Sequence, residues 1–227
     1  EVEGDDEGDV DEHPQDHVDE GVACRATGAG GGNRRVRPWG APGPLPAEGL
    51  VVRTDAEARA VVERARRSGE PIPALGLLGG DLCRTVGGRG DEARLRTADA
   101  VTLPVDVGSV LLDGAPHWFV AHLVIRRSWW RGRVIAVMNA QWIGAWDVAP
   151  RSHPNDGLLD VLDGDLSLDD RLKARRRLAT GTHVPHPGIR QQRVPAVQFQ
   201  LDRPTPVWLD GERVGSARTV TAHLEVD

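Results

Sequence analysis

Two acidic turns carry the residues whose types and spacing best suit chemistry. The first is Asn155-Asp156-Gly157, and the second is Leu209-Asp210-Gly211-Glu212. Each Asp-Gly pair favours a tight turn, because glycine takes positive φ without steric cost. Each turn also adjoins an apolar run of the kind found in buried strands. Such turns can hold carboxylates at the edge of a sheet, where phosphoryl transfer or a metal ion could use them. The alternative is that both are ordinary hairpin turns.

The charge of the chain is unevenly distributed. The net charge is −6, but residues 1–20 hold eleven Asp or Glu and no Lys or Arg. The remainder therefore has 28 basic and 23 acidic residues, a net charge of +5. This body suits an anionic partner such as a nucleotide or a phospholipid surface. We do not expect a nucleic-acid partner, because the sequence lacks zinc-ligand spacing and its basic residues are scattered.

Cysteine usage and hydropathy bear on the compartment. The two cysteines, Cys24 and Cys83, are too few for a disulfide framework and fit a reducing cytosol. No apolar run approaches the roughly 18 residues of a membrane span, and the chain starts without a signal-peptide pattern. We therefore expect a cytoplasmic protein without a transmembrane segment, and peripheral contact with the inner membrane face is compatible with this.

Composition divides the chain into three parts, with boundaries at residues 1–46, 47–98 and 99–227. The first part is acidic and then rich in glycine and proline, so we expect a disordered tail. Its glycine run, Gly28–Gly32, could suit a phosphate loop, but no strand precedes it and no amphipathic helix follows.

The second part has the pattern of a small α/β unit. A short strand at 50–52 precedes a helix capped by Thr54 or Asp55 and ended by Gly69. A second strand at 74–78 then leads into a short helix at 81–86.

The third part is mostly strands. Residues 105–112 and the hairpin signal Asp113-Gly114 precede residues 118–125, whose nearly continuous apolar run predicts a strand buried on both faces. Further strands are expected at 134–138, 194–201, 206–209 and 220–226.

One helix interrupts these strands, from Ser167 to Leu178. Ser167 is its expected cap, and Leu168, Leu172, Ala174 and Leu178 are expected to face inward. Its final turns are strongly basic, which either complements the helix dipole or provides contacts to phosphate headgroups.

A pair of tryptophans and a pair of histidines were also considered as binding sites. Trp129 and Trp130, which have arginines on both sides, could form a membrane-interface patch or a half-buried strand end. His183 and His186 are not expected to form a zinc pair, because the prolines at 185 and 187 exclude a helix there.

Five stretches occur in an order typical of one known family. They are Asn139–Gly144, Ala149-Pro150, Asn155–Val161, Gly181-Thr182-His183 and Leu209–Glu212. These stretches resemble the C-terminal half of the diacylglycerol kinase and sphingosine kinase superfamily, particularly its bacterial YegS-like lipid kinases. Residues 74–87 and Val105–Gly108 resemble two earlier stretches of the same family.

The resemblance implies transfer of the ATP γ-phosphoryl group to a lipid hydroxyl, with Mg²⁺ and a carboxylate base. It assigns Glu212 as the proton acceptor and Asp210 as its neighbour at the magnesium or nucleotide. Asp156, with His153, matches a structural metal site found in some members. The implied nucleotide-binding residues are Asp55, Gly79, Gly80 and Asp81.

The sequence also departs from the family in its nucleotide loops. The main loop, Gly-Gly-Asp-Gly-Thr in the family, corresponds here to residues 53–57, where only Asp55 is retained and Glu57 adds negative charge. The second loop is shortened to Gly79-Gly80-Asp81. The alternative function is therefore an inactive pseudokinase that binds a lipid, a nucleotide or a protein. The expected fold is α+β in two parts: a reduced, Rossmann-like α/β portion packed on a β-sandwich-like antiparallel domain.

Overall fold

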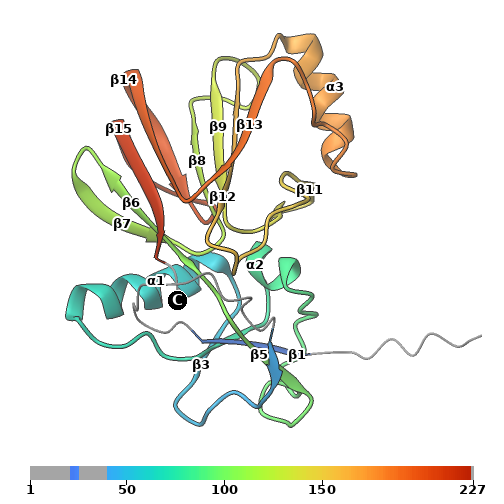
Figure 1. Ribbon diagram of the computed structural model, residues 1–227, viewed down its shortest axis with the longest axis vertical. Helices are drawn as coiled ribbons and strands as arrows, with labels where there is room; N and C mark the ends of the chain where they lie inside the picture. The colour runs from blue at the N-terminus through green and yellow to red at the C-terminus, as the bar shows by residue number, and fades with distance from the viewer. Residues whose placement is uncertain (1–20, 26–39, 226–227) are drawn as a thin grey trace, which may run out of the picture.

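The computed structural model describes the backbone of residues 21–25 and both backbone and side chains of residues 40–225. A five-stranded sheet and an eight-stranded sheet form its two parts, and helices α1 and α2 lie between them (Figure 1). A small ribbon of β10 (Trp142–Ile143) and β11 (Trp146–Asp147) stands apart from both sheets. The predicted two-part α+β fold is thus confirmed. Within the described residues, no helix is long and apolar enough to cross a membrane.

The five-stranded sheet has mixed strand directions. Its strands are β1 (Gly21–Arg25), β2 (Ala41–Pro42), β3 (Leu50–Val52), β4 (Leu75–Leu77) and β5 (Ala100–Pro104). The order is β2-β5-β1-β4-β3, with β1 parallel to β5 and antiparallel to β4. Strand β5 therefore belongs to this sheet, although it lies beyond the predicted boundary at residue 98.

The prediction that residues 1–46 form an unpacked tail is wrong for the described part of that stretch. Residues 21–25 form β1, the central strand of the five-stranded sheet, and Ala41–Pro42 form β2 at its edge. Leu45 is 3% exposed and packs with Ala74 and Leu95. Residues 1–20 and 26–39 lie outside the described residues.

Helices α1 (Asp55–Ser68) and α2 (Gly80–Thr85) follow β3 and β4. Thr54 caps α1 by accepting the backbone N–H of Glu57 at 3.1 Å, and Gly69 ends the helix with a φ of 74°. Both signals act within one turn of the chain, which is why the sequence predicts them. Apolar residues of α1 and α2 share one core with Val105, Val120 and Ala140 of the second part.

The eight-stranded sheet is antiparallel throughout. Its order is β13-β12-β9-β8-β14-β15-β6-β7. The strands are β6 (Val107–Leu112), β7 (Ala115–Phe119), β8 (His122–Arg126), β9 (Val134–Met138), β12 (Leu159–Gly164), β13 (Ile189–Val194), β14 (Ala196–Leu209) and β15 (Glu212–Glu225). Val110 of β6 and Val137 of β9 share one core although they lie far apart in strand order. The sheet therefore curls so that its two halves enclose a sandwich-like core.

Two predictions about the second part are wrong. Residues 118–125 form two strands, β7 and β8, instead of one, because the backbone turns away at Val120 and Ala121 to donate hydrogen bonds to a side chain. In helix α3 (Leu168–Leu178), Leu168 and Leu172 are 58% and 42% exposed. The inward face carries Arg171 and, as predicted, Ala174, and Leu178 packs against the adjoining core. Ser167 caps α3 as predicted.

Candidate functional site

Asp210 lies in the tight turn that joins β14 to β15. Asp210 and Gly211 have φ values of 48° and 84°, as a two-residue hairpin loop of type I′ requires. The Asp210 carboxylate accepts the backbone N–H groups of Val120, Ala121 and His122 at 3.0, 2.8 and 3.1 Å. Its side chain is wholly buried. Asp210 thus holds the β14–β15 turn against the break between β7 and β8.

Asp55, at the start of α1, caps helix α2. Gly79 offers α2 no side-chain cap, and the Asp55 carboxylate accepts the N–H groups of Asp81 and of Leu82, the latter at 3.1 Å. A carboxylate at this position satisfies helix donors that would otherwise lack partners. The predicted nucleotide-binding residues Asp55, Gly80 and Asp81 are therefore brought together. The N–H groups that a phosphate would use here are engaged by a carboxylate of the chain itself.

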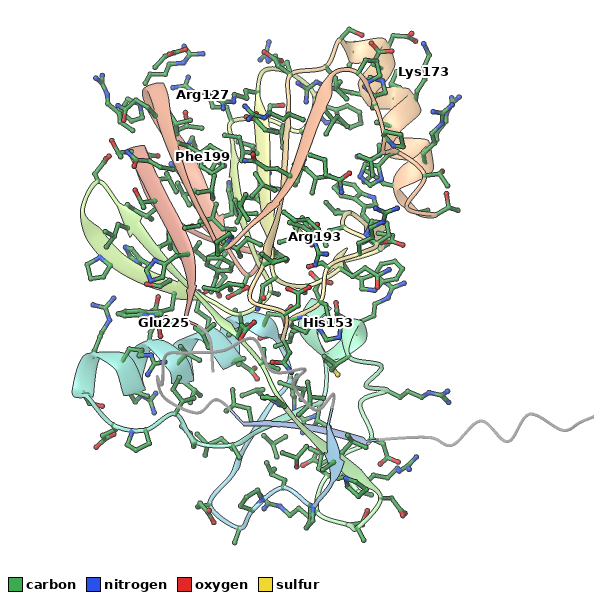
Figure 2. The ribbon with its side chains drawn as sticks, viewed as in Figure 1. Arg127, His153, Lys173, Arg193, Phe199 and Glu225 are labelled. Atoms are coloured by element: carbon green, nitrogen blue, oxygen red, sulfur yellow. The ribbon has the colours of Figure 1, made fainter. Side chains whose placement is uncertain are left out.

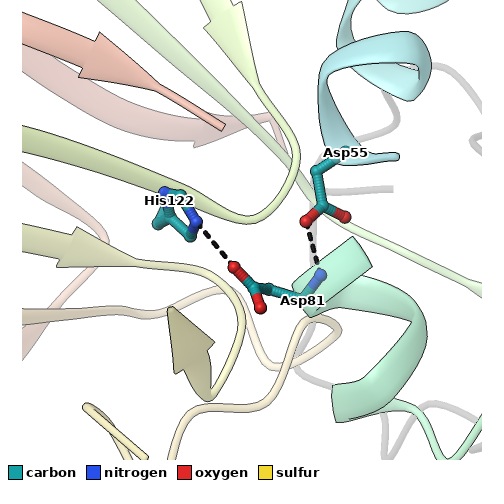
Figure 3. A group of neighbouring side chains, drawn as sticks. All are labelled: Asp55, Asp81 and His122. Carbon is teal, nitrogen blue, oxygen red and sulfur yellow. Dashed lines mark hydrogen bonds and ion pairs between the residues drawn. The ribbon is translucent and has the colours of Figure 1, made fainter. Parts of the chain in front are cut away.

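His122 connects the first turn of α2 to the eight-stranded sheet (Figure 3). Its Nε2 lies 3.0 Å from Asp81 Oδ2, and Asp81 Oδ1 accepts the N–H of Gly144 at 2.8 Å. His122 is 3% exposed. Burial lowers the pKa of His122, but the hydrogen bond to Asp81 and the charges of Asp210, Asp81 and Asp55 outweigh burial, so its pKa is raised. This upward shift in pKa favours the protonated form of His122, in which Nε2 donates to Asp81.

Arg59 joins helix α1 to the second acidic turn, Asp210–Glu212. Its guanidinium donates to the Glu212 carboxylate, and its Nε lies 3.8 Å from Asp210 Oδ2. It also lies 3.5 Å from Glu63, four residues further along α1. The Arg59 side chain is 9% exposed, while that of Glu212 is 62% exposed. Glu212 is thus a solvent-accessible carboxylate whose orientation is fixed by the buried guanidinium of Arg59.

A cavity of about 450 Å³ opens beside this constellation, with His122 and Gly211 in its wall. The remaining wall is largely apolar and aromatic, and includes Val124, Trp129, Ile143, Trp146 and Trp208. The Arg126 guanidinium lies over the rings of Trp129 and Trp208, at 4.3 and 4.6 Å. A mostly apolar pocket next to a few polar groups is the usual form of a small-molecule site.

Two of these aspartates, Asp55 and Asp81, have the chemistry of Mg²⁺ ligands. Among the described residues, Asp55, Asp81 and His122 form the one group whose ligating atoms gather closely enough for a metal, within 4.8 Å of one another. Carboxylate oxygens are the ligands that Mg²⁺ prefers. Asp81 is also reachable, because its side chain is 16% exposed. The two aspartates therefore fit the cation, and His122 borders the place that it would take.

The predicted metal pair Asp156 and His153 has a different environment. Asp156 forms an ion pair with Arg193, whose Nε also lies 3.2 Å from Asp160 Oδ2 (Figure 2 labels Arg193 and His153). Burial lowers the pKa of His153; the charge of Asp156 opposes this shift, and that of Arg193 adds to it. The residues do not fit a metal, since a guanidinium occupies the place beside the carboxylate where a cation would bind.

The loop around Asp156 instead supports the site through hydrogen bonds. Asp106 accepts the N–H of Gly157 at 2.8 Å, and its backbone N–H donates to Pro154 at 2.7 Å. Asn139 donates to the carbonyl oxygens of Asp106 and Val120, at 2.7 and 2.8 Å. The two acidic turns are therefore linked through the backbone at Val120. The first turn is not a hairpin but a loop that leads into β12.

Sequence patterns did not single out Arg59 or His122. Arg59 lies four residues after Asp55 and four before Glu63, which places three charged residues on one face of α1. His122 is the one titratable residue in the apolar run from 118 to 125. Both signals are present in the sequence, but neither identifies the distant partner.

The buried acids predict a pH dependence of stability. Burial and the charge of Asp210 raise the pKa of Asp55 from 3.8 to about 6. Between these values the folded state keeps a proton that the unfolded state releases, so stability falls as the pH rises. Two pH units correspond to about 3 kcal/mol in the free energy of unfolding. Urea unfolding at several pH values should show this slope, and Asp55→Asn should reduce it. Equal slopes for the two proteins would contradict the assignment.

Gly80 tests the contact between α1 and α2. Its φ is 93°, and a Cβ added there would lie 2.4 Å from Asp55 Oδ1. Gly80→Ala should therefore displace the Asp55 cap and lower the free energy of unfolding by about 2–4 kcal/mol. Gly87→Ala is the matched control, because Gly87 has a φ of 82° with open space around its Cβ position. Losses of similar size in the two variants, measured by urea unfolding, would show that backbone strain alone is responsible.

Comparisons with known proteins find one family model and several solved structures that resemble this chain. The family model described as the YegS C-terminal NAD kinase beta sandwich-like domain matches residues 107–225, more than half of the chain. A crystal structure of a diacylglycerol kinase from Bacillus anthracis strain Sterne is similar, with a TM-score of 0.53 and 15% identity over 79% of this chain and 74% of that chain. A second, described as a candidate diacylglycerol kinase from the same strain, has a TM-score of 0.59 and 14% identity over 79% and 76%. At these identities the likeness shows a shared fold. No curated protein sequence matches.

Proposed function

Because the chain belongs to the family of the YegS C-terminal NAD kinase beta sandwich-like domain, we propose that it is a lipid kinase homologue. In this proposal it transfers the γ-phosphoryl group of ATP to the hydroxyl of a lipid such as diacylglycerol. The observation that carries the proposal is Glu212, an exposed carboxylate held by buried Arg59 next to a largely apolar pocket. A proton acceptor beside a binding surface for hydrocarbon is what transfer to a lipid hydroxyl requires.

Each residue of the site has a role in this proposal. Glu212 accepts the hydroxyl proton as the lipid oxygen bonds to the γ-phosphorus and ADP leaves. Arg59 orients Glu212, and Asp210 positions the turn by binding three backbone N–H groups. Asp55 and Asp81 would hold Mg²⁺, which supplies charge neutralisation for the phosphates. The apolar pocket excludes water from the acceptor hydroxyl.

One observation favours a second candidate, a pseudokinase that binds lipid without transferring phosphate. The Asp55 carboxylate already occupies the N–H groups of Asp81 and Leu82, where the resemblance places nucleotide. Binding of ATP phosphates there requires Asp55 to move. The two candidates therefore differ in their affinity for ATP.

The deciding experiment combines binding with transfer. The protein is titrated with Mg·ATP by calorimetry and then incubated with diacylglycerol micelles and ATP labelled at the γ-phosphate. The lipid kinase should bind ATP and place label in the lipid fraction. Binding of lipid with no ATP binding at millimolar concentration would overturn the kinase assignment and support the pseudokinase.

A further inference from the structure

Helix α3 and the Trp129–Gly132 turn form one surface, although about forty residues separate them in sequence. Arg171, on the buried face of α3, donates to the carbonyl oxygens of Trp129, at 3.4 Å, and Gly132. Arg175 lies over the rings of Trp130 and Trp146, at 5.0 and 5.1 Å. The helix thus fixes the turn from two sides. We call the exposed part of these two segments the α3–tryptophan surface.

The α3–tryptophan surface gathers exposed apolar side chains. Trp130, Leu168 and Leu172 are 47%, 58% and 42% exposed, and they are three of the five large apolar side chains that the described residues expose. Leu168, Leu172 and Arg175 lie on one side of α3 by their spacing, and Arg175 contacts Trp130. Apolar residues gathered in this way indicate contact with a partner more often than singly exposed ones do.

The same surface is positively charged. Lys173 pairs with Asp169 and Asp170 and points outward from the far end of the molecule (Figure 2). Arg175, Arg176 and Arg177 also lie on α3, and no carboxylate in the described part of the chain pairs with them. Arginines beside an exposed tryptophan and leucines match the boundary between phosphate headgroups and acyl chains.

The surface also adjoins the candidate site. Beneath α3 is a cavity of about 130 Å³, lined mainly by apolar side chains that include Val134, Leu162 and Ile189. Its wall shares Trp129, Ile143 and Trp146 with the pocket beside His122 and Gly211. Apolar walls therefore continue from the exposed surface towards the Glu212 turn.

We propose that the α3–tryptophan surface docks the protein on a bilayer that contains anionic phospholipid. Trp130, Leu168 and Leu172 enter the interface, and the arginines of α3 contact headgroup phosphates. This inference deepens the proposed function and rests on it, because a lipid acceptor lies in a bilayer. Docking orients the aromatic pocket towards the membrane, from which the acceptor enters.

Vesicle sedimentation tests the proposal with the full chain. Wild-type protein should bind vesicles of phosphatidylcholine mixed with phosphatidylserine and should bind pure phosphatidylcholine at least about tenfold more weakly, and salt should release it. Arg176→Glu with Arg177→Glu should lower binding at least about tenfold. Trp130→Ser with Leu168→Ser and Leu172→Ser should lower it on both kinds of vesicle, because it removes the apolar contact.

Matched controls separate this surface from general charge and hydrophobicity. Arg64→Glu with Arg218→Glu makes the same change in net charge away from α3, and Leu111→Ser changes an exposed leucine on β6; both should leave binding unchanged. Urea unfolding verifies that each variant is folded. Salt-insensitive binding of wild type, or equal losses in the controls, would overturn the proposal. Vesicle binding requires neither ATP nor phosphoryl transfer, so the two proposals can fail separately. A protein that binds vesicles without kinase activity would support membrane docking alone. An active protein that does not bind vesicles would support the kinase assignment alone.

Discussion

Glu212→Gln is expected to lower phosphoryl transfer to the lipid by about 10²–10⁴-fold, the usual contribution of a general base. The glutamine has the same shape, and its amide oxygen can still accept the hydrogen bond from Arg59. It cannot take up the proton of the acceptor hydroxyl. Because Glu212 is 62% exposed, its replacement should scarcely change the free energy of unfolding. The loss should therefore appear in kcat, with the affinity for Mg·ATP unchanged, as labelled-phosphate transfer and calorimetry can measure.

The control for this prediction is Glu70→Gln, which removes an exposed acid just beyond the end of α1. It changes the net charge by the same amount and should retain full activity. Full activity in Glu212→Gln would place the proton acceptor elsewhere in the site. A fall in ATP affinity with unchanged kcat would assign Glu212 to nucleotide binding.

Asp210→Ala is expected to lower the free energy of unfolding by about 3–6 kcal/mol. The substitution leaves the N–H groups of Val120, Ala121 and His122 without their acceptor in a buried region. Each unsatisfied donor costs about 1–3 kcal/mol. Removal of the carboxylate recovers part of this, because burial raises the pKa of Asp210 against the effect of His122 and the three N–H groups. Asp210→Asn should lose less, since its amide oxygen still accepts from two of the donors.

Asp113 provides an internal control for Asp210. It begins the Asp-Gly turn between β6 and β7, has the same φ of 48°, and accepts the N–H groups of Arg218 and Thr219. Its side chain is exposed, so water can replace it. Asp113→Ala should cost only about 0.5–1.5 kcal/mol. Equal losses at the two positions in urea unfolding would show that burial is not what makes Asp210 important.

The features that the sequence predicted correctly are local. Thr54, Gly69 and Ser167 act on donors or acceptors within a turn of their own position, so their spacing is sufficient to place the ends of α1 and the start of α3. The Asp210-Gly211 hairpin is likewise formed by adjacent residues. The ends of helices and the position of this hairpin were therefore predictable, because the interactions that determine them lie within a few residues.

The features that were missed depend on distant partners. Asp210 meets the backbone at Val120–His122, about ninety residues away, and breaks a run whose hydropathy predicts one strand. Arg59 pairs with Glu212, which lies 153 residues later in the sequence. Leu168 and Leu172 have the spacing of a core-facing pair, yet Arg171 anchors α3 with an adjacent face inward. Periodicity shows that a helix has two faces; the partner decides which one is buried.

The central position of β1 has a practical consequence for anyone who shortens this protein. Composition suggests trimming before residue 47, but that cut removes the strand between β4 and β5. Both neighbours would then present unpaired N–H and C=O groups along a new open edge, a template for aggregation. A fragment that keeps residues 21–25 retains the pairing from Gly21 with Ala100 to Arg25 with Pro104. Any shortened version of the protein should therefore begin before Gly21.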